Sequence, residues 1–172
     1  MKIAIIGYSG SGKSTLAQAL GREHQLPVLH LDTLRFAKNW QIRPDEQVRE
    51  ELQGFLEQHT GWVIDGNYSF ALFEERMEQA DQIIFMNFPR WICLWRAVKR
   101  YLTYKGQVRD SMAAGCTEKF DWEFIRWILW EGRSQAYQNK YQDICSRYPD
   151  KVTVLSSQKE IDVFLERVQL VK

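Results

Sequence analysis

The stretch Gly7-Tyr8-Ser9-Gly10-Ser11-Gly12-Lys13-Ser14-Thr15 decides the fold, because it fits the phosphate-binding pattern G-x-x-x-x-G-K-[ST]. The apolar run before it predicts a buried strand over Lys2–Ile6, and a helical pattern follows it. A strand, a glycine-rich loop and a helix in that order are the context in which this pattern binds phosphate. The alternative is a glycine-rich turn without a ligand, which leaves Lys13 and Ser14 unexplained.

The residue types in this loop explain its chemistry. Glycine lets the backbone turn tightly, so that N–H groups point at phosphate oxygens, and the following helix N-terminus adds partial positive charge. Lys13 is expected to reach the β- and γ-phosphates of ATP, and the Ser14 hydroxyl to ligate Mg²⁺. The predicted nucleotide-binding residues are Gly7, Ser9, Gly10, Ser11, Gly12, Lys13, Ser14 and Thr15.

Length and composition predict one compact domain. The chain has 172 residues, of which 45% are apolar, and its 23 basic and 22 acidic residues give a formal net charge of +1. Disorder is therefore excluded as the dominant state, and no global charge attracts nucleic acid or a membrane, so direct binding to either is not expected. The three cysteines form no C-x-x-C pair, which predicts reduced thiols and, without an export signal, a cytoplasmic location.

Short apolar runs alternate with helical patterns, which predicts an α/β fold with a parallel sheet flanked by helices. The expected strands are Lys2–Ile6, Pro27–Leu31, Trp62–Ile64, Gln82–Met86 and Lys151–Leu155. The expected helices after the first are Pro44–Gln58, one that starts at Pro89, one over about 121–147 and one over about 159–168. The least regular segment, between Tyr104 and Lys119, is predicted to be a loop or lid.

Five of the seven tryptophans fall between Trp91 and Trp130. Their number favours packing in the core or an interface, and the alternatives are a base-stacking pocket and the surface of a homodimer. On the helix after Pro89, an apolar stripe that includes Trp91, Trp95 and Leu102 lies opposite Arg96 and Arg100.

The chain lacks the guanine-reading pattern N/T-K-x-D and is too short for large motors or transporters, which favours a small-molecule kinase. It resembles the adenylate kinase-like P-loop kinases, and among them the DNA topology modulation proteins (FlaR-like). The stretches that carry the resemblance are GYSGSGKSTLA, PVLHLDTLRF, WVIDGNYS, FEERMEQADQIIFMNFPRW and FDWEFIRWILWEGR.

The resemblance implies a single P-loop kinase domain over residues 1–172, with a sheet in strand order 2-3-1-4-5. It also implies a helical acceptor-binding insertion over about 33–60 and a lid over about 101–122. Asp32, at the end of the second strand, is where such kinases place a carboxylate near Mg²⁺ or the acceptor hydroxyl, and its alternative is a helix cap. Asp65 is expected to take part in the Mg²⁺ site with Ser14 by holding an Mg²⁺-bound water, and its alternative is a turn Asp-Gly.

The sequence departs from adenylate kinases after Asp65-Gly66. Asn67 and Tyr68 stand where those enzymes have Phe-Pro-Arg, whose arginine contacts the acceptor phosphate. This favours a nucleoside or other hydroxyl acceptor over a nucleoside monophosphate, although Arg35, Arg43 or Arg90 could supply a phosphate partner.

Arginines downstream resemble the lid arginines of this group. Arg96 and Arg100 are one helical turn apart, and Arg133 lies in Glu-Gly-Arg. Such guanidiniums neutralise charge on a transferring phosphoryl group, and the alternative is a solvated helix face. The prediction is an ATP- and Mg²⁺-dependent kinase with a small-molecule acceptor. The alternative is a nucleotide-dependent regulator that affects DNA topology through a partner.

Overall fold

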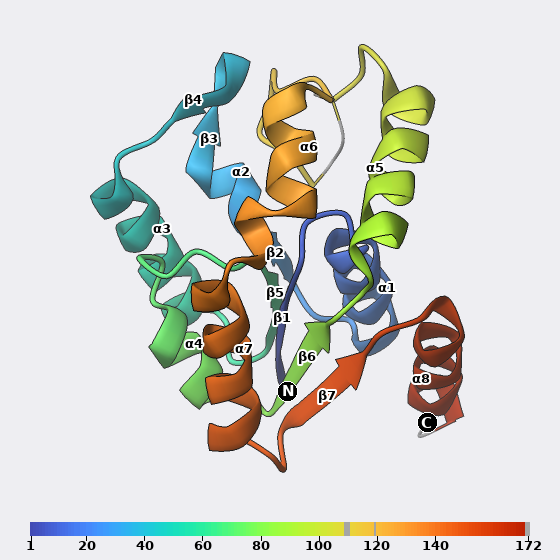
Figure 1. Cartoon of the computed structure of the whole chain (residues 1–172). Coiled ribbons are helices and arrows are strands. Elements are labelled where there is room, and N and C mark those ends of the chain that lie inside the picture. The colour runs from blue at the N-terminus through green and yellow to red at the C-terminus, as the bar shows by residue number, and fades with distance from the viewer. Residues whose placement is uncertain (109–110, 119, 171–172) are drawn as a thin grey trace.

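A five-stranded parallel sheet forms the centre of the computed structural model, which describes residues 1–108, 111–118 and 120–170. The sheet order is β2-β5-β1-β6-β7, and counted along the chain within this sheet it is the predicted 2-3-1-4-5 (Figure 1). The strands are β1 (Lys2–Gly7), β2 (Val28–His30), β5 (Trp62–Asp65), β6 (Gln82–Met86) and β7 (Val152–Leu155). The α/β fold is therefore confirmed.

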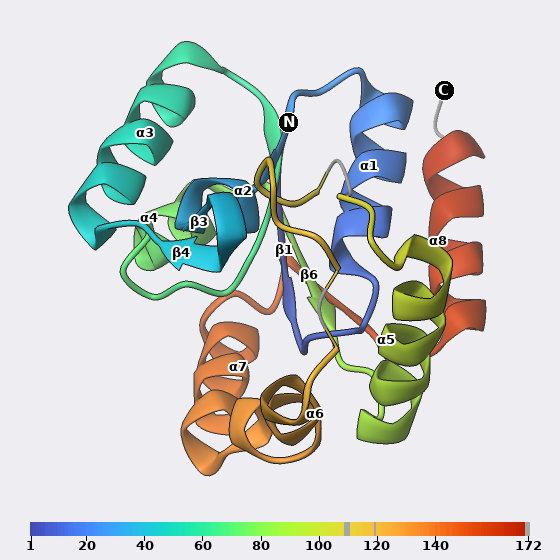
Figure 2. The same cartoon turned by 90° about the horizontal axis from the view of Figure 1, so that it is seen from above.

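Helices cover both faces of this sheet, as parallel strands require. On one side lie α1 (Lys13–His24) and α8 (Gln158–Leu170) (Figure 2). On the other side lie α3 (Asp45–Gln58), α4 (Phe73–Gln79) and α7 (Gln135–Arg147). The central strand β1 is consequently buried on both faces, and Ile3, Ile5 and Ile6 have no exposed surface.

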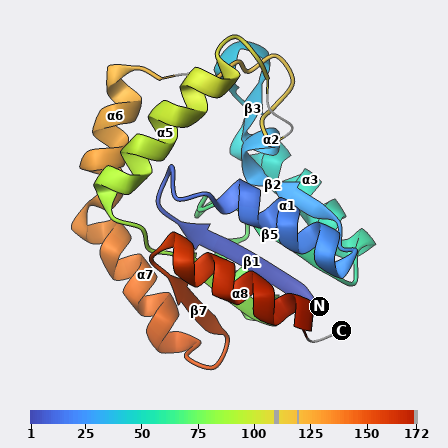
Figure 3. The same cartoon turned by 90° about the vertical axis from the view of Figure 1, so that its right-hand side faces the viewer.

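The remaining elements gather beyond the carboxyl ends of the strands (Figure 3). They are the short helix α2 (Leu31–Arg35), the hairpin strands β3 (Phe36–Ala37) and β4 (Gln41–Ile42), the 3₁₀ turn η1 (Lys38–Trp40), α5 (Arg90–Tyr104), α6 (Trp122–Leu129) and the turn η2 (Glu131–Arg133). In an open parallel sheet this end is where ligands bind. The functional site is therefore expected among these elements.

The single helix predicted over about 121–147 is wrong, because the chain breaks there into α6, η2 and α7. Trp130 leaves helical geometry at φ −133° and ψ −64°. Gly132 then approaches α6 so closely that a Cβ there would lie 2.9 Å from the Trp127 carbonyl oxygen. Residues 131–135 carry no apolar side chain, so the break falls where the apolar pattern is interrupted.

Core packing for the tryptophan cluster is also wrong for four of its five members. Trp91, Trp95, Trp122 and Trp130 are exposed, and Trp127 is half-buried. The helix α5 turns its arginines rather than its apolar stripe toward the domain, because Arg96 hydrogen-bonds the carbonyl of Ser11. Among the described residues, no helix is long and apolar enough to cross a membrane.

Candidate functional site

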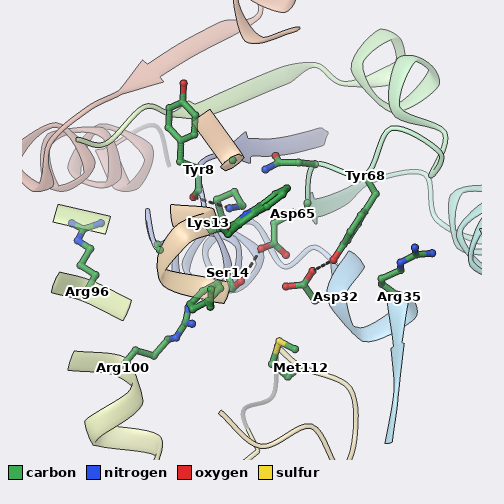
Figure 4. A pocket seen from close by; sticks show the side chains of 18 of the residues that line it. Tyr8, Lys13, Ser14, Asp32, Arg35, Asp65, Tyr68, Arg96, Arg100 and Met112 are labelled. Atoms are coloured by element: carbon green, nitrogen blue, oxygen red, sulfur yellow. Dashed lines mark hydrogen bonds between the residues drawn. The ribbon is translucent and has the colours of Figure 1, made fainter. Parts of the chain in front are cut away.

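A cavity of about 1310 Å³ opens beyond the ends of β1, β2 and β5 (Figure 4). Its wall runs from the glycine-rich loop, through Asp65 and Asp32, to the β3–β4 hairpin. Residues predicted from distant parts of the sequence therefore share one space. The predicted residues that line it are Ser9, Gly10, Gly12, Lys13, Ser14, Thr15, Asp32, Arg35, Asp65, Asn67, Tyr68, Arg96 and Arg100.

The glycine-rich loop has the backbone geometry that only glycine adopts easily. Gly10 and Gly12 have φ values of 79° and 102°, and a Cβ at Gly10 would lie 2.5 Å from the Cys93 carbonyl oxygen. Lys13 begins α1 and donates through Nζ to the Tyr8 carbonyl oxygen, 3.0 Å away. Burial lowers the pKa of the Lys13 ammonium, and the nearby carboxylates of Asp65 and Asp32 oppose this shift.

Ser14 and Asp65 meet at the start of α1. The Ser14 hydroxyl donates to Oδ2 of Asp65 at 2.8 Å, and Oδ1 of Asp65 pairs with Nδ1 of His30. His30 ends β2 next to Asp65 in the sheet register, and both side chains are buried. The histidine therefore fixes the carboxylate so that Oδ2 faces Ser14. The sequence places His30 two residues before Asp32, and this spacing is the signal that could have pointed to it.

Asp32 and Tyr68 form a second polar pair farther along the cavity (Figure 4). The Tyr68 hydroxyl donates to Oδ1 of Asp32 at 2.7 Å. Burial raises the pKa of the Tyr68 phenol strongly, and the adjacent Asp32 carboxylate raises it further. Tyr68 therefore stays a hydrogen-bond donor to Asp32 at physiological pH.

Asn67 lines the cavity, but its amide is engaged by the glycine-rich loop. Its Oδ1 accepts from the Gly7 N–H at 3.0 Å, and its Nδ2 donates to the Gly7 carbonyl oxygen. The loop 66–72 that carries Asn67 is held from behind by two cations that the sequence did not single out. Arg76 donates to the carbonyl oxygens of residues 66, 68 and 71, and Lys140 to the Asn67 carbonyl oxygen.

Arg35 and Arg43 are both engaged by carboxylates. Arg35 pairs with Asp45 and lies over the Phe70 ring, with 4.6 Å between its Cζ and the ring centroid. Arg43 pairs with Glu51 through both terminal nitrogens and is absent from the described lining of the cavity. The positive charges of these two predicted phosphate partners are therefore already compensated by neighbouring carboxylates.

The predicted lid arginines divide into two groups. Arg96 donates to the Ser11 carbonyl oxygen and to Gln158, and Arg100 pairs with the buried Glu118 at 2.6 Å. Both line the cavity beside the glycine-rich loop. Arg133 instead lies 3.8 Å above the Tyr8 ring centroid and donates to the Phe88 carbonyl oxygen at 2.7 Å. Arg133 thus contacts the glycine-rich loop at Tyr8 but is not among the described residues that line the cavity.

Two further residues of the glycine-rich loop have contacts that the sequence did not predict. Trp127 donates through its indole N–H to the Ser9 hydroxyl at 3.1 Å, so α6 approaches the loop directly. The Ser11 hydroxyl is buried without a hydrogen-bond partner among the described residues, although the Ser11 backbone carbonyl accepts from Arg96. Nothing in the spacing of the tryptophans distinguished Trp127 from its four exposed neighbours.

The segment after α5 contacts the β3–β4 hairpin. We call this contact the clasp, formed by residues 111–118 against residues 36–42. Trp40 donates through its indole N–H to the Thr117 carbonyl oxygen at 3.1 Å, and the Cys116 thiol to the Ala37 carbonyl oxygen at 3.1 Å. Met112 and Cys116 pack there with Phe36 and Trp40. Residues 109, 110 and 119 of the predicted lid lie outside the described residues.

These features define the chain as an α/β protein with the P-loop kinase fold. The structure is similar to that of a deoxyadenosine kinase from M. mycoides, solved with the products dCMP and a flexible dCDP bound. The TM-score is 0.51 at 14% sequence identity, and the match covers 100% of both chains. No family model and no curated protein matches the sequence. The comparisons thus support the kinase fold but not the resemblance to the topology modulation group.

Proposed function

We propose that the chain is an ATP- and Mg²⁺-dependent kinase that phosphorylates a hydroxyl group of a small acceptor, with a nucleoside as the favoured class. The observation that carries the proposal is one cavity with a phosphate-binding loop at one end and the Asp32–Tyr68 pair at the other. A nucleotide-dependent switch would need the loop but no acceptor pocket.

The residues present fit ATP and Mg²⁺. The loop offers bare backbone, Lys13 and the N-terminus of α1 to phosphate oxygens. Ser14 and Asp65 offer the hard oxygen atoms that Mg²⁺ prefers. Among the described residues, no group of three or more His, Cys, Asp or Glu could hold a metal alone. This suits Mg²⁺ in kinases, which takes one or two protein ligands and completes its shell with phosphate and water.

The side chains divide the work of phosphoryl transfer. Lys13 holds the β- and γ-phosphates, and bound Mg²⁺ would neutralise part of their charge. Asp32 accepts the proton of the acceptor hydroxyl, while Tyr68 keeps the Asp32 carboxylate oriented by its hydrogen bond. Arg96 and Arg100 lie on the loop side of the cavity, where they can approach the transferring group. Catalysis then consists mostly of positioning and charge stabilisation.

The acceptor end of the cavity favours a neutral, planar molecule. Phe36, Trp40, Tyr68 and Phe70 line it, and aromatic rings stack on nucleobases. Arg35 is already paired with Asp45, and Arg43 with Glu51, so an acceptor phosphate would have to break an existing ion pair. The fold likeness to a deoxyadenosine kinase supports the same acceptor class.

The proposal is tested by measuring ADP release from Mg·ATP with a panel of nucleosides, nucleoside monophosphates and small hydroxyl metabolites. Lys13→Ala is the blank, because it removes the phosphate contact, and Lys159→Ala on exposed α8 is the matched control. Nucleoside-dependent release by the wild type and the control supports the proposal. A flat panel together with tight ATP binding would favour the regulatory alternative.

A further inference from the structure

We propose that the chain forms a homodimer in which helix α5 of one copy packs antiparallel against α5 of the other across a two-fold axis. The surface is the α5 stripe, defined as Trp91, Trp95, Val98 and Leu102 with Ile92 at its flank. Trp91 is 65% exposed, Trp95 61% and Leu102 69%, so none of them is used by the core of its own domain. This inference does not depend on the proposed function.

The spacing of the stripe is that of a helix pairing surface. Its members follow one another at intervals of four, three and four residues, the 3.5-residue repeat of a coiled-coil seam. The opposite side of α5 is occupied within the domain, because Cys93 and Ala97 are buried and Arg96 contacts the glycine-rich loop. The helix therefore exposes the α5 stripe to solvent, while its opposite side packs against its own domain.

The sizes of the side chains favour a second copy of the same helix. An antiparallel two-fold pairing about the midpoint between Trp95 and Val98 places Trp95 opposite Val98 and Trp91 opposite Leu102. Each large ring then meets a smaller aliphatic side chain, which lets the two seams interdigitate. The same operation brings Ile92 beside the aliphatic stem of Lys99, so no like charges face each other. A surface that complements itself in this way suits an isologous dimer.

The exposed area is large enough for a specific dimer. The exposed parts of the two tryptophans, Leu102 and Ile92 amount to on the order of 500 Å² of apolar surface per copy. Two copies together would bury about 1,000 Å², the size at which specific interfaces begin. The exposed bases of α5 are Arg90 and Lys99, fewer than the roughly four to eight that polybasic membrane docking uses.

Sedimentation equilibrium over a concentration series tests the proposal. We expect the wild type to have the mass of two chains, and Trp95→Glu to raise the dimer dissociation constant by roughly 100-fold, since a central Trp is a typical interface hot spot. Trp122→Glu, at an equally exposed tryptophan on α6, is the matched control and should stay dimeric. Both variants change exposed side chains. A melting profile that matches that of the wild type, measured at high dilution in the same buffer, would verify that they fold.

Cross-linking tests the antiparallel arrangement separately. In the double variant Ile92→Cys/Lys99→Cys, mild oxidation should join position 92 of one copy to position 99 of the other, and the wild type under the same conditions should remain uncross-linked. A 92-to-92 link would overturn the antiparallel arrangement. A monomeric wild type, or a dimer that Trp122→Glu breaks and Trp95→Glu does not, would overturn the surface. Binding of such a monomer to phosphatidylserine vesicles would assign the stripe to a membrane instead.

Discussion

At the scale of single residues, the hydrogen-bonded pair Asp32–Tyr68 and the glycine-rich loop lie at opposite ends of the cavity. In the proposed function, the loop, Lys13 and Ser14 would bind the nucleotide at one end of the cavity, and Asp32 would face the acceptor at the other. Changes at Asp32 and at Lys13 should therefore have different kinetic signatures. A residue that acts only in the transition state lowers kcat without weakening ATP binding.

Asp32→Asn should lower kcat by about 10²- to 10⁴-fold, the usual range for a general base, and leave the Kd for Mg·ATP within about threefold. Tyr68→Phe keeps the ring and loses only the hydroxyl donor, so its kcat should fall by about tenfold. Steady-state kinetics with the acceptor found in the panel, together with calorimetric titration of ATP, measures both. Full activity in Asp32→Asn would remove Asp32 from the catalytic residues.

Lys140 gives the free energy of unfolding a dependence on pH. Burial lowers its pKa to about 8, with Arg76 adding repulsion, whereas an unfolded lysine titrates near 10.4. Between these values the unfolded chain binds more protons, so the free energy of unfolding should rise with pH from about 8 to 10. Partial exposure limits the rise to about 1–2 kcal/mol.

The comparison with Lys140→Met isolates this contribution. Both proteins are unfolded with urea at several pH values. The free energy of unfolding of the wild type, minus that of Lys140→Met, should increase as the pH rises. Parallel pH profiles for the two proteins would contradict the assignment. Lys159→Met, at an exposed lysine on α8, should reproduce the wild-type profile.

At the scale of elements, the clasp between residues 111–118 and the hairpin lines the end of the cavity where we propose that the acceptor binds. It rests on a small separate cluster and three hydrogen bonds to backbone carbonyl oxygens, rather than on the main core. Local opening of such a unit costs much less free energy than global unfolding. We therefore expect the clasp to be the element that admits the acceptor.

Trp40→Ala removes both the ring that packs on Phe36 and the hydrogen bond to Thr117. It should raise the KM for the acceptor by about tenfold, leave the Kd for ATP unchanged, and accelerate alkylation of the buried Cys116 thiol. Reaction with a maleimide, followed by peptide mass spectrometry, measures the last effect. An unchanged Cys116 rate would show that the clasp opens without involving Trp40.

The sequence predicts elements well where the pattern is long and local. The five strands and the glycine-rich loop follow from buried apolar runs and from a motif with a strict spacing. The outward turn of α5 does not, because it depends on the contact between Arg96 and the distant glycine-rich loop. The break at Trp130 is also not predicted, although its cause, the close approach of Gly132 to Trp127, is local. Within the site, Ser14 and Asp65 could be paired in advance, whereas Arg76, Lys140 and Trp127 carry no local signal that marks them.

At the scale of the whole molecule, the glycine-rich loop is continuous with the central sheet, so its stability depends on the fold of the whole domain. The loop leaves the end of β1, whose neighbours β5 and β6 are also buried. A ligand that binds the folded loop should therefore stabilise the entire domain rather than one segment. This is the expected behaviour of linked folding and binding.

Mg·ATP at about 100 times its Kd should raise the free energy of unfolding by about 2.7 kcal/mol. For a domain of this length, the melting temperature should then rise by about 5–10 °C. Differential scanning fluorimetry of the wild type and of Lys13→Ala measures the effect. The variant should show little shift at the same ATP concentration, and an equal shift in both proteins would place the nucleotide elsewhere.

The double hydrogen bond between Asn67 and Gly7 has a consequence for engineering. Residues 66–72 look like an exchangeable loop that could be transplanted from a kinase with another acceptor, yet Asn67 holds the first residue of the nucleotide loop and Lys140 holds Asn67. A graft that replaces this loop alone would disturb nucleotide binding as well as acceptor choice. Redesign of specificity should therefore keep Asn67, Tyr68, Arg76 and Lys140 as a fixed frame and vary Phe70, which lines the cavity.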